Sequence, residues 1–269
     1  MKKRFVFSAV CALAALISWN ANAQTTITPI PNPGCNDTLP MINDNGEMVW
    51  ASYDGVEWDI FYFDGQSVTR LLTPGCFDRF PQINNSGQIV WEGFDSLGWG
   101  IYYFDGLNIL RISDPTVMSF GPKINNSNVI VWYTSGRTGS FIFTYRDGFA
   151  AQIPSTPGYV NINPQINDNG DIAWVGYTYF DNDWDIFTFD GTTINRIEHL
   201  GFLDNMPPSI NNNGDVSWAS YNGTDWDIVV SDGNSITTLT TPECYDRVTP
   251  QINDAGQVTW SGFDGTDWE

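Results

Sequence analysis

The chain has 269 residues, with 31 acidic and 11 basic side chains and a formal net charge of −20 at pH 7. A surface of this charge repels phosphate backbones, which argues against nucleic acid as a partner and is compatible with a cationic one. The single histidine, His199, excludes a histidine-rich metal site and limits a Ser-His-Asp or Cys-His site to one built around it. We expect His199 to be an exposed loop residue.

Residues 1–23 have the layout of a secretory signal peptide. Residues 2–4 are basic, residues 5–19 are apolar, and Ala21-Asn22-Ala23 is a small-residue cleavage site. We therefore expect a mature chain that starts at Gln24, is exported to the periplasm or the extracellular space and has no transmembrane segment. Residues 24–269 keep 8 basic against 31 acidic residues, a net charge of −23.

A phrase of the form Pro-x-Ile-Asn, followed by a turn and then a Trp, occurs six times between residues 24 and 269. The intervals between copies are 41, 41, 42, 44 and 42 residues, the length of one four-stranded propeller blade. The pattern predicts one all-β domain, a six-bladed β-propeller. The copies begin at Pro40, Pro81, Pro122, Pro164, Pro208 and Pro250.

Counting from each proline gives the expected strands. Position +6 is Gly in five copies and Asn128 in the other, the residues that best accept a positive φ, so a hairpin turn is expected there. An Asp-Gly pair marks a second hairpin turn about 24 residues after the proline in five of the repeats. Each repeat thus reads as four strands without a helix. Position +10 is always Trp, and with position +8 it should pack between neighbouring blades: Trp50, Trp91, Trp132, Trp174, Trp218 and Trp260.

The two ends of the propeller carry a further prediction. Ile27-Thr28-Pro29-Ile30 matches the fourth-strand pattern Ile236-Thr237-Thr238-Leu239, so an N-terminal strand is expected to complete the last blade and close the ring. The sixth repeat stops at Trp268-Glu269, where its third strand should begin. We therefore expect the chain to be truncated at its C-terminus.

The repeat resembles that of TolB-type (WD40-like) six-bladed propellers. The resemblance rests on residues 42–50 (Ile-Asn-Asp-Asn-Gly-Glu-Met-Val-Trp), residues 59–65 (Asp-Ile-Phe-Tyr-Phe-Asp-Gly) and Arg70-Leu71. It implies the fold, and it leaves the role open because this propeller type serves as a scaffold beside peptidase domains and also occurs in polysaccharide lyases. The chain has Asn-Asp-x-Gly or Asn-Asn-x-Gly where the family has Ser-Pro-Asp-Gly, and it lacks the separate N-terminal domain of TolB.

The two hairpin turns of each repeat lie on one rim, so the more variable loops lie on the opposite rim, where binding residues are expected. A second column of Trp, flanked by acidic residues, stands on that opposite rim, with Ser140 at the matching place in the third repeat. Aromatic faces beside carboxylates suit a saccharide or a protein ligand, and the alternative is that each Trp covers the end of its own blade. The candidate ligand-binding residues are Trp58, Trp99, Trp184, Trp226 and Trp268 with Asp78, Arg79, Asp246 and Arg247.

Three cysteines remain after the signal peptide, five, five and six residues before the prolines of their repeats: Cys35, Cys76 and Cys244. Export permits a disulfide, the spacing leaves the pairing open, and the odd count leaves one thiol free or shared with another molecule. No cofactor is expected. Calcium is a weaker possibility, through residues 43–46 and 53–55, because neither segment has the alternating acidic spacing of a calcium loop.

The favoured function is an exported, non-catalytic propeller that binds a saccharide or a protein on the Trp-bearing rim. One alternative is a structural repeat domain of a larger envelope or surface protein. Another is a polysaccharide-degrading enzyme that uses paired carboxylates.

Overall fold

The computed structural model describes residues 15–17, 27–30, 36–73, 75–154, 159–179, 182–197, 199, 204–239 and 248–262. Every element in these ranges is a β-strand. None of them is a helix long and apolar enough to cross a lipid bilayer. The all-β prediction is therefore confirmed for the described part of the chain.

The strands form antiparallel meanders that we call blades one to six, in chain order. Blade one comprises β3 (Asn36–Ile42), β4 (Met48–Tyr53), β5 (Trp58–Phe63) and β6 (Val68–Leu71). Blade two comprises β7 (Gly75–Ile83), β8 (Ile89–Asp95), β9 (Gly98–Phe104) and β10 (Ile109–Arg111). Blade three comprises β11 (Met118–Ile124), β12 (Ile130–Gly136), β13 (Gly139–Arg146) and β14 (Phe149–Gln152).

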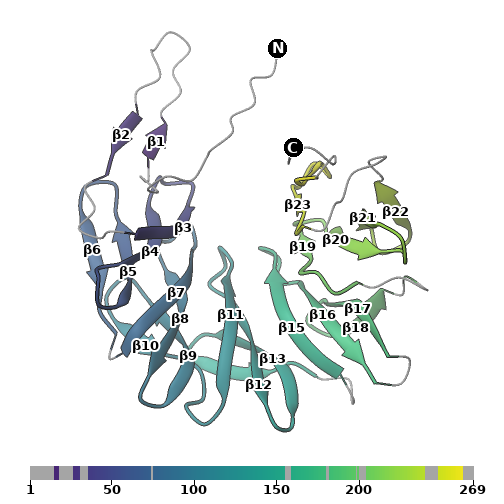
Figure 1. Ribbon diagram of the computed structural model, residues 1–269, viewed down its shortest axis with the longest axis horizontal. Coiled ribbons are helices and arrows are strands. Elements are labelled where there is room, and N and C mark those ends of the chain that lie inside the picture. The colour runs from purple at the N-terminus through teal and green to yellow at the C-terminus, as the bar shows by residue number, and fades with distance from the viewer. Residues whose placement is uncertain are drawn as a thin grey trace.

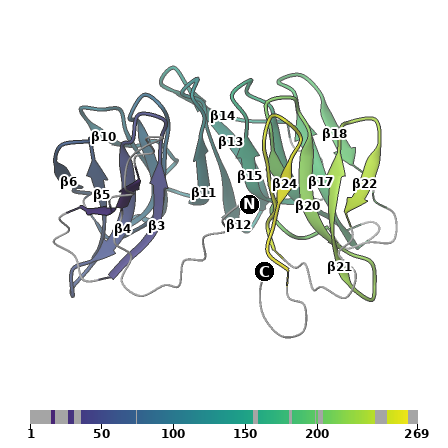
Figure 2. The same cartoon turned by 90° about the horizontal axis from the view of Figure 1, so that it is seen from above.

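Blade four comprises β15 (Tyr159–Ile166), β16 (Ile172–Thr178), β17 (Asp183–Phe189) and β18 (Ile194–Ile197). Blade five comprises β19 (Ser209–Ile210), β20 (Val216–Tyr221), β21 (Trp226–Ser231) and β22 (Ile236–Leu239), and the described part of blade six is the hairpin β23 (Gln251–Ile252) with β24 (Val258–Thr259). Figure 1 shows the blades following one another around an arc, with first strands such as β7, β11 and β15 on its inner side and fourth strands such as β6, β18 and β22 on its outer side. In Figure 2 the strands run from one rim of this arc to the other.

The predicted turns have the backbone conformation that the sequence requires. At position +6 the φ angle is positive in every repeat, from 58° at Asn128 to 93° at Gly170. The glycines of the Asp-Gly pairs have φ between 82° and 100°. Because successive strands of a blade run in opposite directions, both turns lie on one rim, which we call the turn rim, and the loops between second and third strands lie on the opposite rim.

The core lies between neighbouring blades, as the position +8 and +10 pattern predicts. Ile89 and Trp91 of blade two pack against Val49, Ala51 and Ile60 of blade one, and the same arrangement recurs along the chain. In blades one to four the buried Trp also stacks on the aromatic residue of the third strand beside it, with Trp91 6.0 Å from Tyr102 at 19° between their planes, whereas Trp218 of blade five faces Val229. The first five of these Trp are at most 2 % exposed: Trp50, Trp91, Trp132, Trp174 and Trp218.

A ladder of asparagine side chains joins the blades at the turn rim. In the first five repeats the Asn at position +3 donates its side-chain amide to the backbone carbonyl of the same Asn in the next blade, and its Oδ1 accepts backbone N–H groups of its own turn. One side chain thus closes a turn and couples two blades. The nitrogen-to-oxygen distances are 2.9 Å for Asn43–Asn84, 3.1 Å for Asn84–Asn125, 2.8 Å for Asn125–Asn167, 2.9 Å for Asn167–Asn211 and 3.0 Å for Asn211–Asn253.

The N-terminal strand that is predicted to complete the last blade pairs in this structure with a segment of the predicted signal peptide, so closure of the ring in a chain that starts at Gln24 stays a prediction. The strand β2 (Ile27–Pro29) pairs antiparallel with β1 (Ala15–Ile17), and Ile30 packs against Met48, Trp50 and Phe61 of blade one. The two strands are close in sequence, so their pairing costs less loop-closure entropy than pairing with a strand more than 200 residues away. Ile30 at the same time covers the apolar face that Met48, Trp50 and Phe61 form on blade one.

The predicted truncation of the sixth repeat concerns residues 263–269, which lie outside the described residues. It therefore stays a prediction. Within the described part, the asparagine ladder ends at Asn253, whose side-chain amide donates to Gln257 Oε1 at 2.9 Å.

The ladder makes a testable prediction about stability. Asn125→Ala should lower the free energy of unfolding by about 3 kcal/mol, because the Asn167 carbonyl loses one donor, and the part-buried N–H of Ser127 and the buried N–H of Val129 lose their acceptor. Asn253→Ala is the matched control, since this exposed Asn ends the ladder, and it should cost less than about 1 kcal/mol. Urea unfolding of both variants checks this, and equal losses would contradict a role for the inter-blade bond.

Candidate ligand-binding site

A cavity of about 590 Å³ lies along the first strands, on the inner side of the arc. All six repeats contribute to its wall, the fifth through Pro207. The variable position x of Pro-x-Ile-Asn faces the cavity in most repeats and supplies several of its polar side chains. These wall residues are Met41, Gln82, Lys123, Gln165 and Gln251.

A β-bulge shapes this wall in blades one to four. The residue before the proline has a positive φ of 55° at Leu39, 54° at Phe80, 63° at Gly121 and 55° at Asn163, and the strand register shifts at the same point. A bulge bends its strand and changes the direction of the side chains next to it. Here it brings residues on both sides of the proline, such as Phe80 and Gln82, onto the cavity wall.

Two cations line the cavity, and their surroundings differ. Arg79 Nε is 2.8 Å from Glu92 Oε2, and Glu92 Oε1 accepts the Gly121 N–H at 2.7 Å, so this guanidinium is neutralised by a carboxylate held in place. Lys123 Nζ donates to the neutral Oε1 of Gln82 at 3.3 Å. Burial lowers the pKa of the Lys123 ammonium from its ordinary value.

Aromatic side chains gather next to the cavity on the rim opposite the turn rim. We call the six residues Phe77, Arg79, Phe80, Phe94, Trp99 and Phe120 the Trp99 cluster. Its centre is the half-buried ring of Trp99, with Phe94 at 5.3 Å, Phe77 at 6.1 Å and Phe120 at 6.2 Å between ring centroids.

The Arg79 guanidinium lies 4.0 Å from the centroid of Trp99 and 5.0 Å from that of Phe80, within the range of a cation–π interaction. Phe77, Phe80 and Phe94 are 40 %, 43 % and 39 % exposed, so the cluster presents apolar surface to solvent. The sequence analysis identified Trp99 and Arg79, and the structure brings these two together. It did not identify the phenylalanines, whose exposure depends on the packing of blades two and three.

The other described members of the Trp column pack inside their own blades. Trp58, Trp184 and Trp226 each lie against a tyrosine at the end of the preceding strand, at 5.6, 5.1 and 5.4 Å from Tyr53, Tyr177 and Tyr221. Trp226 is only 6 % exposed, and Trp58 also contacts Phe77 of the Trp99 cluster. Trp268 lies outside the described residues.

Three of the acidic residues beside these Trp, namely Glu57, Asp59 and Asp185, bind arginines of the fourth strands. Arg70 contacts Glu57 at 2.7 Å and Asp59 at 2.6 Å and lies 3.6 Å from Asp54, and Arg196 contacts Asp185 at 2.7 Å. The carboxylates of Asp54, Glu57 and Asp59 are close enough together to hold a metal ion, but the guanidinium of Arg70 contacts all three. The carboxylate oxygens that calcium would need at residues 53–59 are therefore already in contact with Arg70.

Asp78 lies in the interior of blade two. Its side chain is 1 % exposed, and its Oδ2 accepts the Thr73 hydroxyl at 2.6 Å. Burial raises the pKa of Asp78 to about 7, in opposition to the hydrogen bond from Thr73, which lowers it. The remaining predicted residues are outside the described part of the structure: Asp246, Arg247, Cys35, Cys244 and the side chain of Cys76.

His199 is not the exposed loop residue that we expected, since its side chain is only 14 % exposed. Its Nδ1 lies 3.1 Å from Ser220 Oγ and 3.7 Å from Asp204 Oδ1. A Ser-His-Asp relay needs the serine and the carboxylate on opposite ring nitrogens, and here both face Nδ1. Ser220 is also 0 % exposed, so this trio does not present a nucleophile to a substrate.

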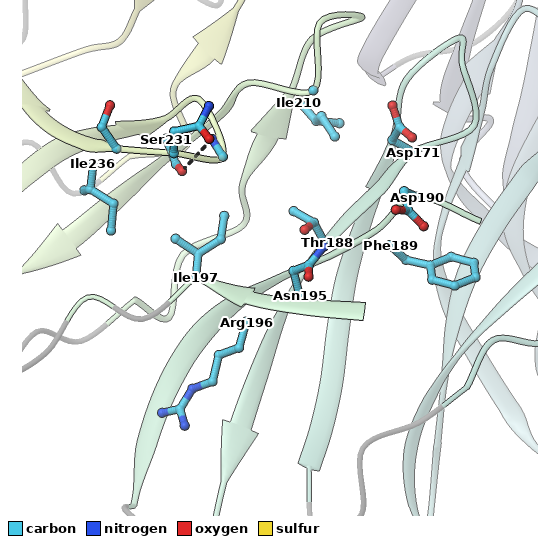
Figure 3. A pocket seen from close by; sticks show the side chains of 14 residues that line it. Asp171, Thr188, Phe189, Asp190, Asn195, Arg196, Ile197, Ile210, Ser231 and Ile236 are labelled. Carbon is cyan, nitrogen blue, oxygen red and sulfur yellow. Dashed lines mark hydrogen bonds between the residues drawn. The ribbon is translucent and has the colours of Figure 1, made fainter. Parts of the chain in front are cut away.

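A second cavity, of about 760 Å³, lies between blades four and five (Figure 3). Ile197, Ile210 and Ile236 form apolar parts of its wall, whereas the Arg196 guanidinium points away from them. Its carboxylates are already engaged, because Asp190 accepts N–H groups of its own turn and Asp171 accepts the Asn167 amide. The carboxylates of this groove are therefore less available to a ligand than the polar side chains of the central cavity.

Sequence reasoning missed the cavity, although a signal for it was present. Position x is the only variable position in an otherwise constant phrase, and variation within a repeated scaffold marks positions that the fold does not prescribe. The constant Asn at position +3 likewise had no assigned role until the ladder was seen.

No protein-family model matches the chain, and no curated protein matches it in sequence. Solved structures match it in fold. The β-propeller domain of the Trilobed protease from Pyrococcus furiosus, described as having an open velcro topology, superposes with a TM-score of 0.62 and 13 % identity over 92 % of this chain and 86 % of that one. Inactive H270A virginiamycin B lyase from Staphylococcus aureus, solved with quinupristin, gives 0.58 and 12 % identity over 90 % and 83 %.

TolB from Acinetobacter baumannii gives a TM-score of 0.53 and 15 % identity over 81 % of this chain, which spans 57 % of that protein. At these identities the likeness concerns the fold alone. Together with the repeated meanders and the inter-blade core, it establishes that this chain is a β-propeller protein.

The buried Asp78 predicts a pH dependence of stability. In the unfolded chain an aspartate titrates near pH 4 (about 3.9), so between about pH 4 and pH 7 the folded protein holds a proton that the unfolded chain has lost. The free energy of unfolding should therefore fall as the pH rises through this window. Asp78→Asn, which removes the titration, should gain a few kcal/mol relative to the parent protein between pH 4.5 and pH 8, because one pKa unit corresponds to about 1.4 kcal/mol.

Urea unfolding of both proteins at these two pH values checks the prediction. A stability difference that stays constant across the range would contradict the raised pKa of Asp78.

Proposed function

We propose that this chain is an exported, non-catalytic β-propeller that binds a protein partner through the Trp99 cluster. The observation that carries the proposal is the set of three exposed phenylalanines, Phe77, Phe80 and Phe94, around a half-buried Trp99 and an arginine held by a buried glutamate. Aromatic residues and arginine are enriched in protein–protein interfaces, and the energy of such interfaces concentrates in well-packed aromatic anchors.

A protein ligand agrees better with this rim than a saccharide does. Stacking on a sugar needs an accessible aromatic face, and Trp58, Trp184 and Trp226 are packed against tyrosines of their own blades. Hydrogen bonding to sugar hydroxyls needs free carboxylate oxygens, and those of Glu57, Asp59 and Asp185 are bound to arginines.

The charge of the molecule supports a partner of a particular kind. With a formal net charge of −20, the propeller attracts a cationic protein and accelerates its encounter, while the apolar centre of the Trp99 cluster supplies contact area. We further infer that residues 1–23 direct export and that residues 24–269 form a propeller of the TolB type, on the repeat phrases that carry the resemblance.

Site-specific photo-crosslinking tests the proposed function. A benzoylphenylalanine at position 94, introduced in cells that make the protein, should give a discrete crosslinked species with a protein partner. The same probe at position 149 is the matched control, because Phe149 is 79 % exposed but lies on β14, the outer strand of blade three. Phe77→Ser in the position-94 protein should lower the crosslinking yield several-fold without a large change in Tm, since Phe77 is already partly exposed.

Equal crosslinking at positions 94 and 149, or none at position 94, would overturn the proposal.

A further inference from the structure

The ammonium of Lys123 occupies an unusual environment for such an acidic protein. Lys123 is the only lysine after residue 3, and it lies on the wall of the central cavity. Its one polar contact is the neutral amide oxygen of Gln82, and among the described residues no carboxylate lies within 4.0 Å of it. The chain thus places a cation without a counterion where all six repeats converge.

An uncompensated cation in a partly desolvated site is costly, and a protein with 31 carboxylates could have paired it. The neighbouring Arg79 shows such pairing, since Glu92 neutralises it and is itself fixed by the Gly121 N–H. Among the described residues, Lys123 is therefore the cation in the cavity wall that no carboxylate neutralises. An anion that enters would supply the missing counterion.

The rest of the wall indicates what kind of anion fits. Gln165 and Gln251 provide amide groups at the equivalent position of their own repeats, while Leu39, Phe80 and Phe120 provide apolar surface. The volume of about 590 Å³ is typical of small-molecule sites. Phosphate carries more than one negative charge at neutral pH, which one ammonium in a strongly acidic protein does not balance, whereas a carboxylate carries one.

We propose that the central cavity binds a small monocarboxylate with an apolar body, whose carboxylate pairs with the Lys123 ammonium. This site lies beside the Trp99 cluster but does not depend on a protein partner. The protein would then have two ligands, a small carboxylate in the central cavity and a protein partner at the Trp99 cluster.

Calorimetric titration of the full chain with phenylacetate tests the proposal, with its neutral analogue phenylacetamide as the ligand control. Phenylacetate should bind saturably, and phenylacetamide and inorganic phosphate should bind at least tenfold more weakly. Lys123→Met should raise the Kd of phenylacetate at least tenfold, and Lys123→Arg, which keeps the charge, should raise it less. Arg137→Met is the matched variant, since it removes one exposed cation from the loop between β12 and β13 and should leave the Kd within twofold.

A second measurement holds even if a Lys123 variant fails to fold. Reductive methylation with ¹³C-formaldehyde keeps the charge of the ammonium and places a single reporter after residue 3. The Lys123 methyl resonance should shift saturably with phenylacetate and remain unmoved by phenylacetamide.

Absence of phenylacetate binding, equal affinity for phenylacetamide or phosphate, or an unmoved Lys123 resonance would each overturn the proposal. Equal weakening by Lys123→Met and Arg137→Met would do so as well, because it would reduce the effect to net charge. Failure of the crosslinking experiment at position 94 would leave these results unaffected, so the two proposals can fail separately.

Discussion

The asparagine ladder at the turn rim is the interaction on which the rest of the structure depends. Each Asn at position +3 closes its own turn through Oδ1 and holds the next blade through its side-chain amide, at 2.8–3.1 Å along the series from Asn43 to Asn253. Both functions need a donor and an acceptor on one short side chain, which only Asn supplies at this length. The ladder thereby fixes the spacing at which the buried Trp of each blade meets the preceding one.

This constraint separates the parts of the repeat that build the fold from those that are free to differ. The Trp of the first five repeats is buried, the Asn of the first five repeats is bonded to the next blade, and the Ile of repeats two to five packs against the inter-blade core. In most repeats position x faces the central cavity, where the first strands converge, and it varies from Met41 to Gln82 to Lys123. The bulge before the proline in blades one to four helps to expose this position to the cavity.

The rim opposite the turns follows a different rule. Several of its acidic residues form ion pairs within their own blades. The pairs are Arg70–Asp59, Arg111–Asp95 and Arg196–Asp185. Its tryptophans pack on their own strand ends, except around Trp99, where three phenylalanines remain exposed. The Trp column repeats regularly in the sequence, but in the structure its surroundings differ around Trp99, where exposed phenylalanines gather.

The sequence by itself determined the strands, both turns of each blade and the inter-blade Trp packing, because these depend on periodicity and on residues that tolerate a positive φ. It identified Trp99 and Arg79 but not their contact, and it placed Asp78 and His199 at the surface, whereas both are largely buried. The tertiary structure alone decided the strand partner of Ile27–Pro29 and the surroundings of Lys123. Those features join residues from different repeats, and the physical reason is that burial and charge pairing depend on distances in space that no spacing along the chain specifies.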